Sequence, residues 1–226
     1  MDGESGEGQF LAQPRPRGGL ARQFCDPTGV GGHIVGHIMS VINAVPNRCA
    51  IGALDVGAHD DVLELGFGPG RALQRLAQLA HRGTVTGIDR SDVMMRQAKA
   101  RNRQSISAGT IRLARASFEA LPLADAAVDK ILAVNVIYFF PPRGRALAEA
   151  RRVLRPGGTM SIYATDFSAR RELQFAGPET YQMFDRDSLG AFLEASAFAG
   201  DRIDVQKFRL PLGFHGLLAR ISKTAQ

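Results

Sequence analysis

From Asp61 onward, short apolar runs alternate with stretches in which apolar residues recur every three or four positions. The short runs predict β-strands, and the stretches with helical spacing predict α-helices. Strands are expected over residues 62–65, 85–88, 111–113, 128–134 and 159–164, and helices over 69–81, 91–103 and 143–154. Regular alternation of strand and helix is typical of a parallel sheet with helices on both faces. The sequence therefore predicts an α/β fold of the doubly wound kind.

The C-terminal part of the chain ends this alternation. The Pro-Gly-Gly sequence at 156–158 is expected to stop the preceding helix, and residues 187–197 predict one more helix. Two further strands are expected over 203–208 and 216–221, with residues 211–213 between them. Because this connection is short, the last two strands are expected to pair as an antiparallel hairpin.

The N-terminal residues differ in composition from the rest. Residues 1–20 are rich in Gly, Pro, Gln and Arg, which predicts a flexible tail. Residues 28–45 predict a helix that Pro46 is expected to end, and residues 47–54 predict a second short helix. The expected organisation is a tail (1–20), an N-terminal helical cap (21–56) and a main α/β domain (57–226).

The chain is basic, with a net charge of +6 and a pI of about 9.9, so a nucleic-acid partner has to be considered. The bases are scattered, however, and many fall at the ends of predicted helices, where cations suit the helix dipole. Examples are Arg101, Arg103, Arg151, Arg152 and Arg155. Solvated helix ends are the preferred interpretation, and nucleic acid is not the expected partner.

The N-terminal sequence, the length of the apolar stretches and the number of cysteines together predict a cytoplasmic protein. The first ten residues carry acids where a secretory signal would carry bases. The most apolar stretch, 131–140, is far shorter than the roughly 20 residues of a membrane-spanning helix. Cys25 and Cys49 are too few for a disulfide scaffold or a four-ligand zinc site. We therefore expect reduced thiols, no bound metal and no membrane association.

The strongest local signal is Glu64-Leu65-Gly66-Phe67-Gly68-Pro69-Gly70, where the first predicted strand turns into a helix. Glycines let a backbone approach a ligand closely, and a helix start offers free amide donors. A triphosphate-binding loop needs Lys and then Ser or Thr after its last glycine, but Arg71 and Ala72 stand there. The dinucleotide pattern G-x-G-x-x-G is not met either, because the third glycine comes one position early.

Asp89 follows the glycine loop by about 20 residues and ends the apolar run 85–88. This is the distance expected of an acid that binds a ribose, because a carboxylate at a strand tip can accept both ribose hydroxyls. Together the two features predict a nucleoside site. The alternative is that the glycines only form a tight turn and that Asp89 only caps the helix starting near Ser91.

Five motifs, in this order along the chain, resemble those of class I S-adenosylmethionine-dependent methyltransferases. They are residues 64–70, 87–91, 119–123, 128–131 and 152–158. The resemblance runs from about residue 61 to residue 164. It implies a Rossmann-like sheet of seven strands, mostly parallel with an antiparallel last strand, and makes 57–226 an S-adenosylmethionine-binding methyltransferase domain.

The resemblance also implies where the cofactor, S-adenosyl-L-methionine, binds. The glycine loop with its adjoining backbone would hold the methionine part, Asp89 would hold the ribose, and residues after the second, third and fourth strands would meet the adenine or the methionine end. The implied set is Glu64, Gly66, Phe67, Gly68, Gly70, Asp89, Arg90, Met94, Ser117, Phe118 and Asn135. Ser117 stands where many relatives carry aspartate, so adenine recognition there is expected to depend on backbone contacts.

A sulfonium is already an activated electrophile, so the protein mainly has to align the nucleophile with the methyl group and exclude water. A general base is needed only for an acceptor that must lose a proton. Tyr138, just after the fourth strand, is the first candidate, and ordinary aromatic packing is the alternative. His33 and His37, four positions apart, are candidates for acceptor contact or general base, with a solvated or packed helix face as the alternative.

Residues 166–185 are expected to open over the acceptor side of the sheet. Aromatic residues in this segment, Phe175, Tyr181 and Phe184, together with Met183, are candidates for an apolar pocket. Arg170 and Arg171 are candidates for attracting an anion, although paired arginines in a loop are usually solvated.

The leading hypothesis is methyl transfer to a small organic molecule at oxygen, nitrogen or carbon, by a monomer or homodimer. An RNA or protein methyltransferase, a non-catalytic S-adenosylmethionine-binding protein and an NAD-dependent oxidoreductase are the alternatives. DNA amino-methylation is disfavoured because Val136 and Ile137, not two prolines, separate Asn135 from Tyr138. Arsenic methylation is disfavoured because it would require more thiols than the two present.

Overall fold

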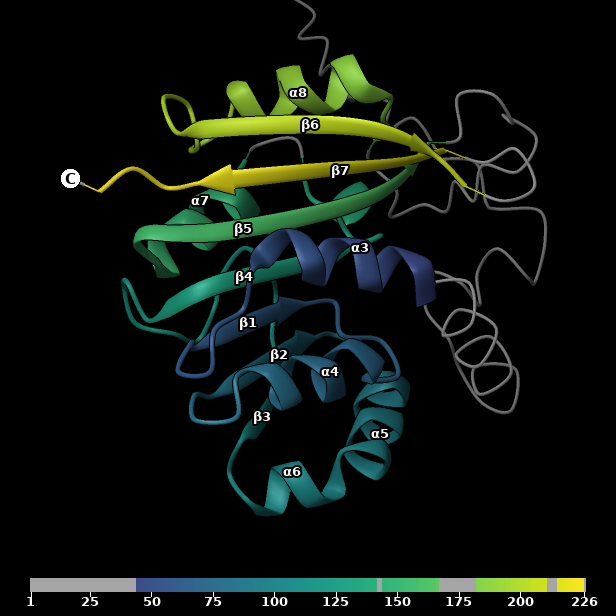
Figure 1. Ribbon diagram of the computed structural model, residues 1–226, viewed down its shortest axis with the longest axis vertical. Coiled ribbons are helices and arrows are strands. Elements are labelled where there is room, and N and C mark those ends of the chain that lie inside the picture. Colours follow the sequence, from purple (N-terminus) through teal and green to yellow (C-terminus); the bar gives the residue numbers. More distant parts are fainter. Residues whose placement is uncertain (1–43, 142–143, 167–181, 211–214, 226) are drawn as a thin grey trace, which may run out of the picture.

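A seven-stranded sheet with the strand order β3-β2-β1-β4-β5-β7-β6 forms the centre of the molecule (Figure 1). The computed structural model describes residues 44–141, 144–166, 182–210 and 215–225. The strands are β1 (Val62–Leu65), β2 (Val85–Asp89), β3 (Ile111–Arg115), β4 (Val128–Val134), β5 (Leu154–Asp166), β6 (Arg202–Arg209) and β7 (His215–Ser222). Neighbours among β1 to β5 pair in parallel, whereas β7 pairs antiparallel with both β5 and β6. The predicted fold class and the predicted antiparallel last strand are confirmed.

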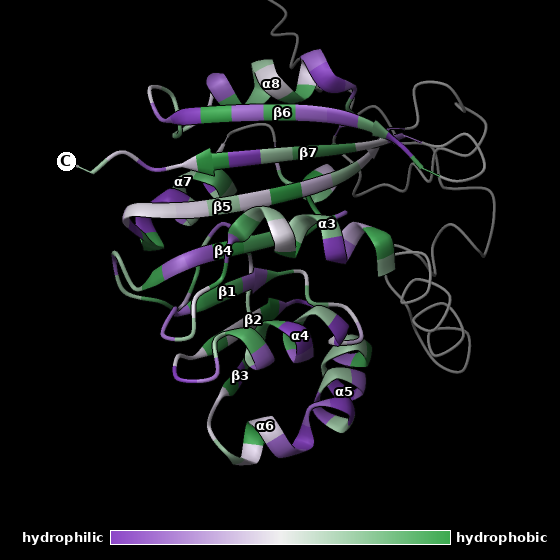
Figure 2. Cartoon of the chain, in the orientation of Figure 1, coloured by the Kyte–Doolittle hydropathy of each residue, from purple (hydrophilic) through white to green (hydrophobic). Residues whose placement is uncertain are grey.

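Helices cover both faces of the sheet, and each face has its own apolar core. They are α3 (Ala44–Leu54), α4 (Arg71–Leu79), α5 (Asp92–Arg101), α6 (Arg103–Ser107), the 3-10 turn η1 (Ile137–Phe139), α7 (Arg145–Val153) and α8 (Arg186–Glu194). Buried residues of α3, α4 and α5 pack together on one face, and those of α7 and α8 on the other. Figure 2 shows hydrophilic and hydrophobic residues alternating along the edge strand β6, which has one solvated face.

One of the two helices predicted before residue 57 can be compared with the structure. Residues 47–54 are helical as expected, but α3 already includes Ala44 and contains Pro46 as its third residue. The expectation that Pro46 separates two helices is therefore wrong. Proline is tolerated in the first turn of a helix, because the amide donors there have no intrahelical acceptor. The predicted tail over 1–20 and residues 28–43 of the other predicted helix lie outside the described residues.

The predicted helix over 143–154 and the Pro-Gly-Gly sequence need a further correction. Helix α7 ends at Val153, and β5 starts at Leu154 instead of Thr159. Leu154 pairs with Val128 and Thr159 pairs with Lys130, so residues 155–158 form an irregularity inside the strand. The glycines there are bound by the C-terminal segment: Gly157 donates its amide to the carbonyl of Lys223 at 3.0 Å. A hydrogen-bond partner this remote in sequence gives no local signal.

A tight turn holds the amino-terminal edge of the sheet. The amide of Arg82 donates to the Ala58 carbonyl at 2.8 Å, which brings the turn after α4 against the loop before β1. A Cβ atom at Gly83 would collide with the backbone carbonyl of Asp60. Within the described ranges, no helix has the length and apolar character needed to cross a membrane.

We predict that Gly83→Ala lowers the free energy of unfolding by about 2–4 kcal/mol, because the two loops must separate to admit the methyl group. The matched control is Gly190→Ala in α8, where a Cβ would meet nothing within 4 Å. That change should raise stability by about 0.5–1 kcal/mol, since alanine loses less backbone entropy in a helix. Urea denaturation measures both, and equal effects of the two substitutions would contradict this account.

Candidate functional site

The glycine loop connects β1 to α4 at the carboxyl edge of the parallel strands. Its three glycines, Gly66, Gly68 and Gly70, have φ angles of +69°, +51° and +80°. These left-handed conformations favour glycine because other L-residues are strained there. The loop is also tied to its neighbours: Gly66 donates its amide to the Ile88 carbonyl of β2 at 2.8 Å. The loop therefore has one fixed path beside the ends of β1 and β2.

Each of these glycines has different surroundings. A Cβ at Gly66 would lie 2.7 Å from a methyl of Val136, and one at Gly70 would lie 2.6 Å from the side-chain nitrogen of Asn102. A Cβ at Gly68 would meet nothing within 4 Å. The outer glycines are thus required by close packing, whereas the middle of the loop presents backbone to open space that a ligand can approach.

The carboxylate of Asp89, at the end of β2, is bonded to this loop. One of its oxygens accepts a hydrogen bond from the amide of Gly68 at 3.0 Å, and the other accepts one from the amide of Ser91 at 2.9 Å. The side chain is 8% exposed, and this burial raises the pKa of Asp89 despite the two amide donors. A carboxylate has about four acceptor positions, so both oxygens keep capacity for hydroxyl donors.

Glu64, the third residue of β1, is a second buried acid at the same edge. It is 3% exposed, and its Oε2 atom has no hydrogen-bond partner within the described residues. Burial, followed by the nearby charge of Asp89, raises the pKa of Glu64 well above its usual range. A buried, unsatisfied acceptor next to another carboxylate favours a ligand that brings a cation or a donor.

The residues predicted to surround an adenine follow β2 and β3. Met94 is buried in α5, whereas Arg90 is exposed with its guanidinium carbon 5.9 Å from the ring centre of Phe139. Ser117 is exposed, and its hydroxyl accepts a hydrogen bond from the Glu119 amide at 3.2 Å. Phe118 lies beside the glycine loop, because its Cζ atom would be 3.8 Å from a Cβ at Gly66. Phe67 within the loop is buried in the core that includes α4 and α5.

The ends of β4 and β5 are joined by a polar cluster. Asn135, just after β4, has a φ of +54°, and its side-chain oxygen accepts hydrogen bonds from the amide and the hydroxyl of Thr165, at 3.0 Å and 3.2 Å. The Tyr138 hydroxyl donates to the Thr165 carbonyl at 2.9 Å. Thr165 therefore fixes two of the predicted site residues, although nothing in the local sequence indicated it.

The surroundings of Tyr138 bear on its predicted role. The ring is buried and lies 6.4 Å from the ring of Phe184 and 6.4 Å from that of Phe139. Burial raises the pKa of the Tyr138 phenol well above its usual range, so the group stays protonated near neutral pH. These contacts support a packing and hydrogen-bonding role more strongly than proton abstraction.

Several predicted residues on the acceptor side lie outside the described residues. They are His33, His37, Arg170, Arg171, Phe175 and Tyr181. Met183 and Phe184 are described, and both pack in the core on the α7 and α8 face of the sheet. Among the described residues, no group of three or more His, Cys, Asp or Glu side chains could hold a metal ion.

Asn102 supports the glycine loop and was missed by the sequence analysis. It is 2% exposed, and its side-chain amide donates to the carbonyls of Gly70 and Ala98, both at 3.0 Å. Asn102 follows α5 and so links the end of that helix to the start of α4. An asparagine after a helix usually indicates only a helix end, so its sequence position does not reveal this contact.

Comparisons with known proteins agree on one family. A family model described as a methyltransferase domain matches residues 63–162. The uncharacterized methyltransferase YdaC of Bacillus subtilis is 30% identical over 173 residues, which cover 76% of this chain and 89% of that protein. The ubiquinone/menaquinone biosynthesis C-methyltransferase UbiE of Acidiphilium cryptum is 34% identical over 60% of this chain and 53% of its own length.

A solved structure shares the fold. The crystal structure of a SAM-dependent methyltransferase from Aquifex aeolicus superimposes with a TM-score of 0.61 and 21% identity. The match covers 77% of this chain and 89% of that one.

We predict that Glu64→Gln removes part of the pH dependence of stability. Because the folded-state pKa of Glu64 is raised above that of the unfolded chain, the wild-type protein should lose stability as pH rises between these two pKa values. The loss is at most about 1.4 kcal/mol per pH unit. The free energy of unfolding of the variant, relative to that of the wild type, should therefore increase as pH rises from about 4.5. Urea denaturation across this range measures the difference.

The control for this prediction is Glu119→Gln, which neutralises an exposed glutamate. Its stability difference from the wild type should stay nearly constant with pH. If the stability difference between the Glu64→Gln variant and the wild type is equally constant with pH, the electrostatic account of Glu64 is contradicted.

Proposed function

This chain belongs to the class I S-adenosylmethionine-dependent methyltransferases, and from that premise we propose that its methyl acceptor is a small organic molecule. In support, the relative UbiE is named as a C-methyltransferase of ubiquinone and menaquinone biosynthesis, and another relative is named as a 27-O-demethylrifamycin SV methyltransferase. The acceptor atom of this chain is proposed to be oxygen, nitrogen or carbon, reached by in-line displacement at the methyl group. The buried pair Glu64 and Asp89 beside the open backbone of Gly68 is the observation that supports the cofactor site. The names of curated relatives support the acceptor class.

The donor set fits S-adenosylmethionine, which the family and fold imply as cofactor. The ligand carries a ribose with two hydroxyl donors, an ammonium group and a positively charged sulfur. Asp89 would accept the ribose hydroxyls, and the unsatisfied Oε2 of Glu64 suits the cationic methionine end. Gly66, Phe67, Gly68 and Gly70 would provide the backbone wall. A cation there would also lower the pKa of Glu64 and make its ionised form favourable.

The adenine residues are proposed on the same basis. Met94 and Arg90 would flank the ring, and Phe118 with the backbone near Ser117 would meet its edge. Ser117 has no carboxylate for the adenine amino group, and its hydroxyl accepts a hydrogen bond from the Glu119 amide. Backbone carbonyls are therefore the proposed acceptors for that amino group.

S-adenosylmethionine, when bound, supplies a methyl group on a sulfonium that is already activated for displacement. The chain's own task is then to orient the acceptor and keep water out. The Asn135, Thr165 and Tyr138 cluster supports this task, because it locks the ends of β4 and β5 in one arrangement. We propose Tyr138 as a positioning residue, with His33 and His37 retained as candidate bases for an acceptor that must lose a proton.

We predict that Asp89→Asn weakens S-adenosylmethionine binding by about 100-fold. The neutral amide has one acceptor oxygen in place of two charged ones, and hydrogen bonds to charged groups contribute about 1.5–3 kcal/mol each. Isothermal titration calorimetry measures the change. The control is Asp92→Asn, which removes an exposed acid three residues away that pairs with Arg115 at 3.1 Å. Equal affinities for both variants would exclude Asp89 from the site.

The proposed acceptor class is tested by transfer of a radiolabelled methyl group to three pools: small metabolites, RNA and protein. We expect label in the small-molecule fraction. Label only in RNA or protein would contradict the proposal and favour the corresponding macromolecular methyltransferase. Binding of the cofactor without transfer to any pool would favour a non-catalytic role.

Once an acceptor is found, Tyr138→Phe separates the two roles of that residue. A positioning role predicts a fall in kcat of about tenfold or less with an unchanged pH profile. A general base typically contributes about 10²- to 10⁴-fold, and its removal would also change the pH profile.

A further inference from the structure

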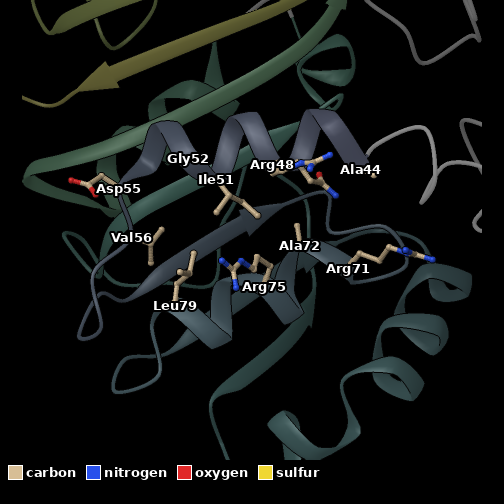
Figure 3. Close-up of a pocket in the computed structure, with 11 residues that line it drawn as sticks. Ala44, Arg48, Ile51, Gly52, Asp55, Val56, Arg71, Ala72, Arg75 and Leu79 are labelled. Atoms are coloured by element: carbon tan, nitrogen blue, oxygen red, sulfur yellow. The ribbon is translucent and has the colours of Figure 1, made fainter. Parts of the chain in front are cut away.

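A groove of about 550 Å³ lies between α3 and α4 (Figure 3). Its apolar wall is formed by Ile51, Val56, Ala72 and Leu79. Ile51 and Ala72 are buried, whereas Val56 and Leu79 are half-buried, so the apolar surface is within reach of a ligand. The groove shares no lining residue with the proposed cofactor site, although Arg71 directly follows Gly70 of the glycine loop.

The charged residues of the groove are mainly basic. Arg48, Arg71 and Arg75 contribute to its lining and are exposed, whereas Asp55 is the one acid in the described lining. Arg75 donates a hydrogen bond to the side-chain oxygen of Gln78 at 3.1 Å. Among the described residues, none of the three arginines forms an ion pair. The groove therefore suits a ligand that combines acidic with apolar groups.

The helix dipoles concentrate the positive potential at one end of the groove. Figures 1 and 3 show that α3 and α4 both begin at the same end, where Ala44 and Arg71 lie, and run in the same direction. Neither helix has an acidic residue in its first turn. Two helix N-termini, each carrying partial positive charge, thus meet near Arg48 and Arg71 with no acid in either first turn.

The chain itself contains a segment with the matching chemistry. Residues 2–11 carry three acids, Asp2, Glu4 and Glu7, followed by Phe10 and Leu11. The first basic residue along the chain is Arg15. An acidic run followed by an apolar pair complements a groove with a basic end and an apolar wall.

The connection between this segment and the groove is long enough. Ala44, the first described residue, is part of the groove lining. Residues 12–43 connect the acidic segment to Ala44, and they would span about 48 Å even as one continuous α-helix. Because α3, which borders the groove, is only about 16 Å long, the segment can reach any part of the groove. Covalent attachment raises the local concentration of such a segment to the millimolar range, so a weak contact is sufficient.

We propose that residues 2–11 dock in the groove between α3 and α4 of the same molecule. The acids pair with Arg48, Arg71 and Arg75, and Phe10 and Leu11 contact the apolar wall. This inference is independent of the proposed acceptor and of the residues assigned to the cofactor.

The test is zero-length carbodiimide coupling in the full chain, with mass spectrometry of the joined peptides. Arg48→Lys places a reactive amine in the groove, and Arg75→Lys is a second variant that does the same from α4. The matched control is Arg82→Lys, an exposed arginine outside the groove lining. We expect coupling of residue 48 or 75 to Asp2, Glu4 or Glu7 at least fivefold above that of residue 82. Circular dichroism verifies that each variant is folded.

Two further measurements test the electrostatic contact and identify the occupant. The coupling should fall to the control level in 1 M NaCl. In a mixture of unlabelled and ¹⁵N-labelled protein, the joined peptides should come from one molecule. Coupling equal to the control overturns the proposal. Joined peptides of mixed isotope also overturn it, because they identify a second copy as the occupant.

Discussion

The hydrogen bond from the Gly68 amide to the Asp89 carboxylate is the interaction on which the site depends. It joins the middle of the glycine loop to the end of the neighbouring strand, so that one buried carboxylate sets both the loop path and the proposed ribose position. The loop accepts this path because its three glycines adopt left-handed backbone conformations. Packing of Val136 against Gly66 and of Asn102 against Gly70 fixes the two ends of the loop. The site is thus held by contacts between segments that the parallel sheet brings to one edge.

The same edge carries an electrostatic cost in the free protein. Glu64 and Asp89 are both buried carboxylates, and the pKa of each is raised by burial. A protein that only had to fold would gain from a neutral residue at position 64, since its Oε2 atom finds no partner among the described residues. The cost is understandable if the pair is completed by a cationic ligand with hydroxyl donors. This is the physical reason for linking the geometry to an adenosyl sulfonium rather than to a neutral nucleoside.

Much of the fold was predictable because its signals are local. The strands over 62–65 and 128–134 were located from their apolar runs. The helix expected over 91–103 begins as α5 with Ser91 as its N-cap, where the Ser91 hydroxyl accepts from the Met94 amide. The site was predictable where it depends on the spacing of the glycines and on Asp89 at the end of β2. The Thr165 cluster and the Asn102 contacts were not, because each joins residues about 30 positions apart. The irregularity inside β5 was missed for the same reason, since its partner is Lys223.

A crystal structure of the full chain with S-adenosylmethionine tests the central claim most directly. The account predicts the ribose hydroxyls on the Asp89 carboxylate, the cationic methionine end facing Glu64, and the backbone of Gly68 against the ligand. Density for the ligand at another place on the molecule, or a ribose bound without Asp89, would contradict it.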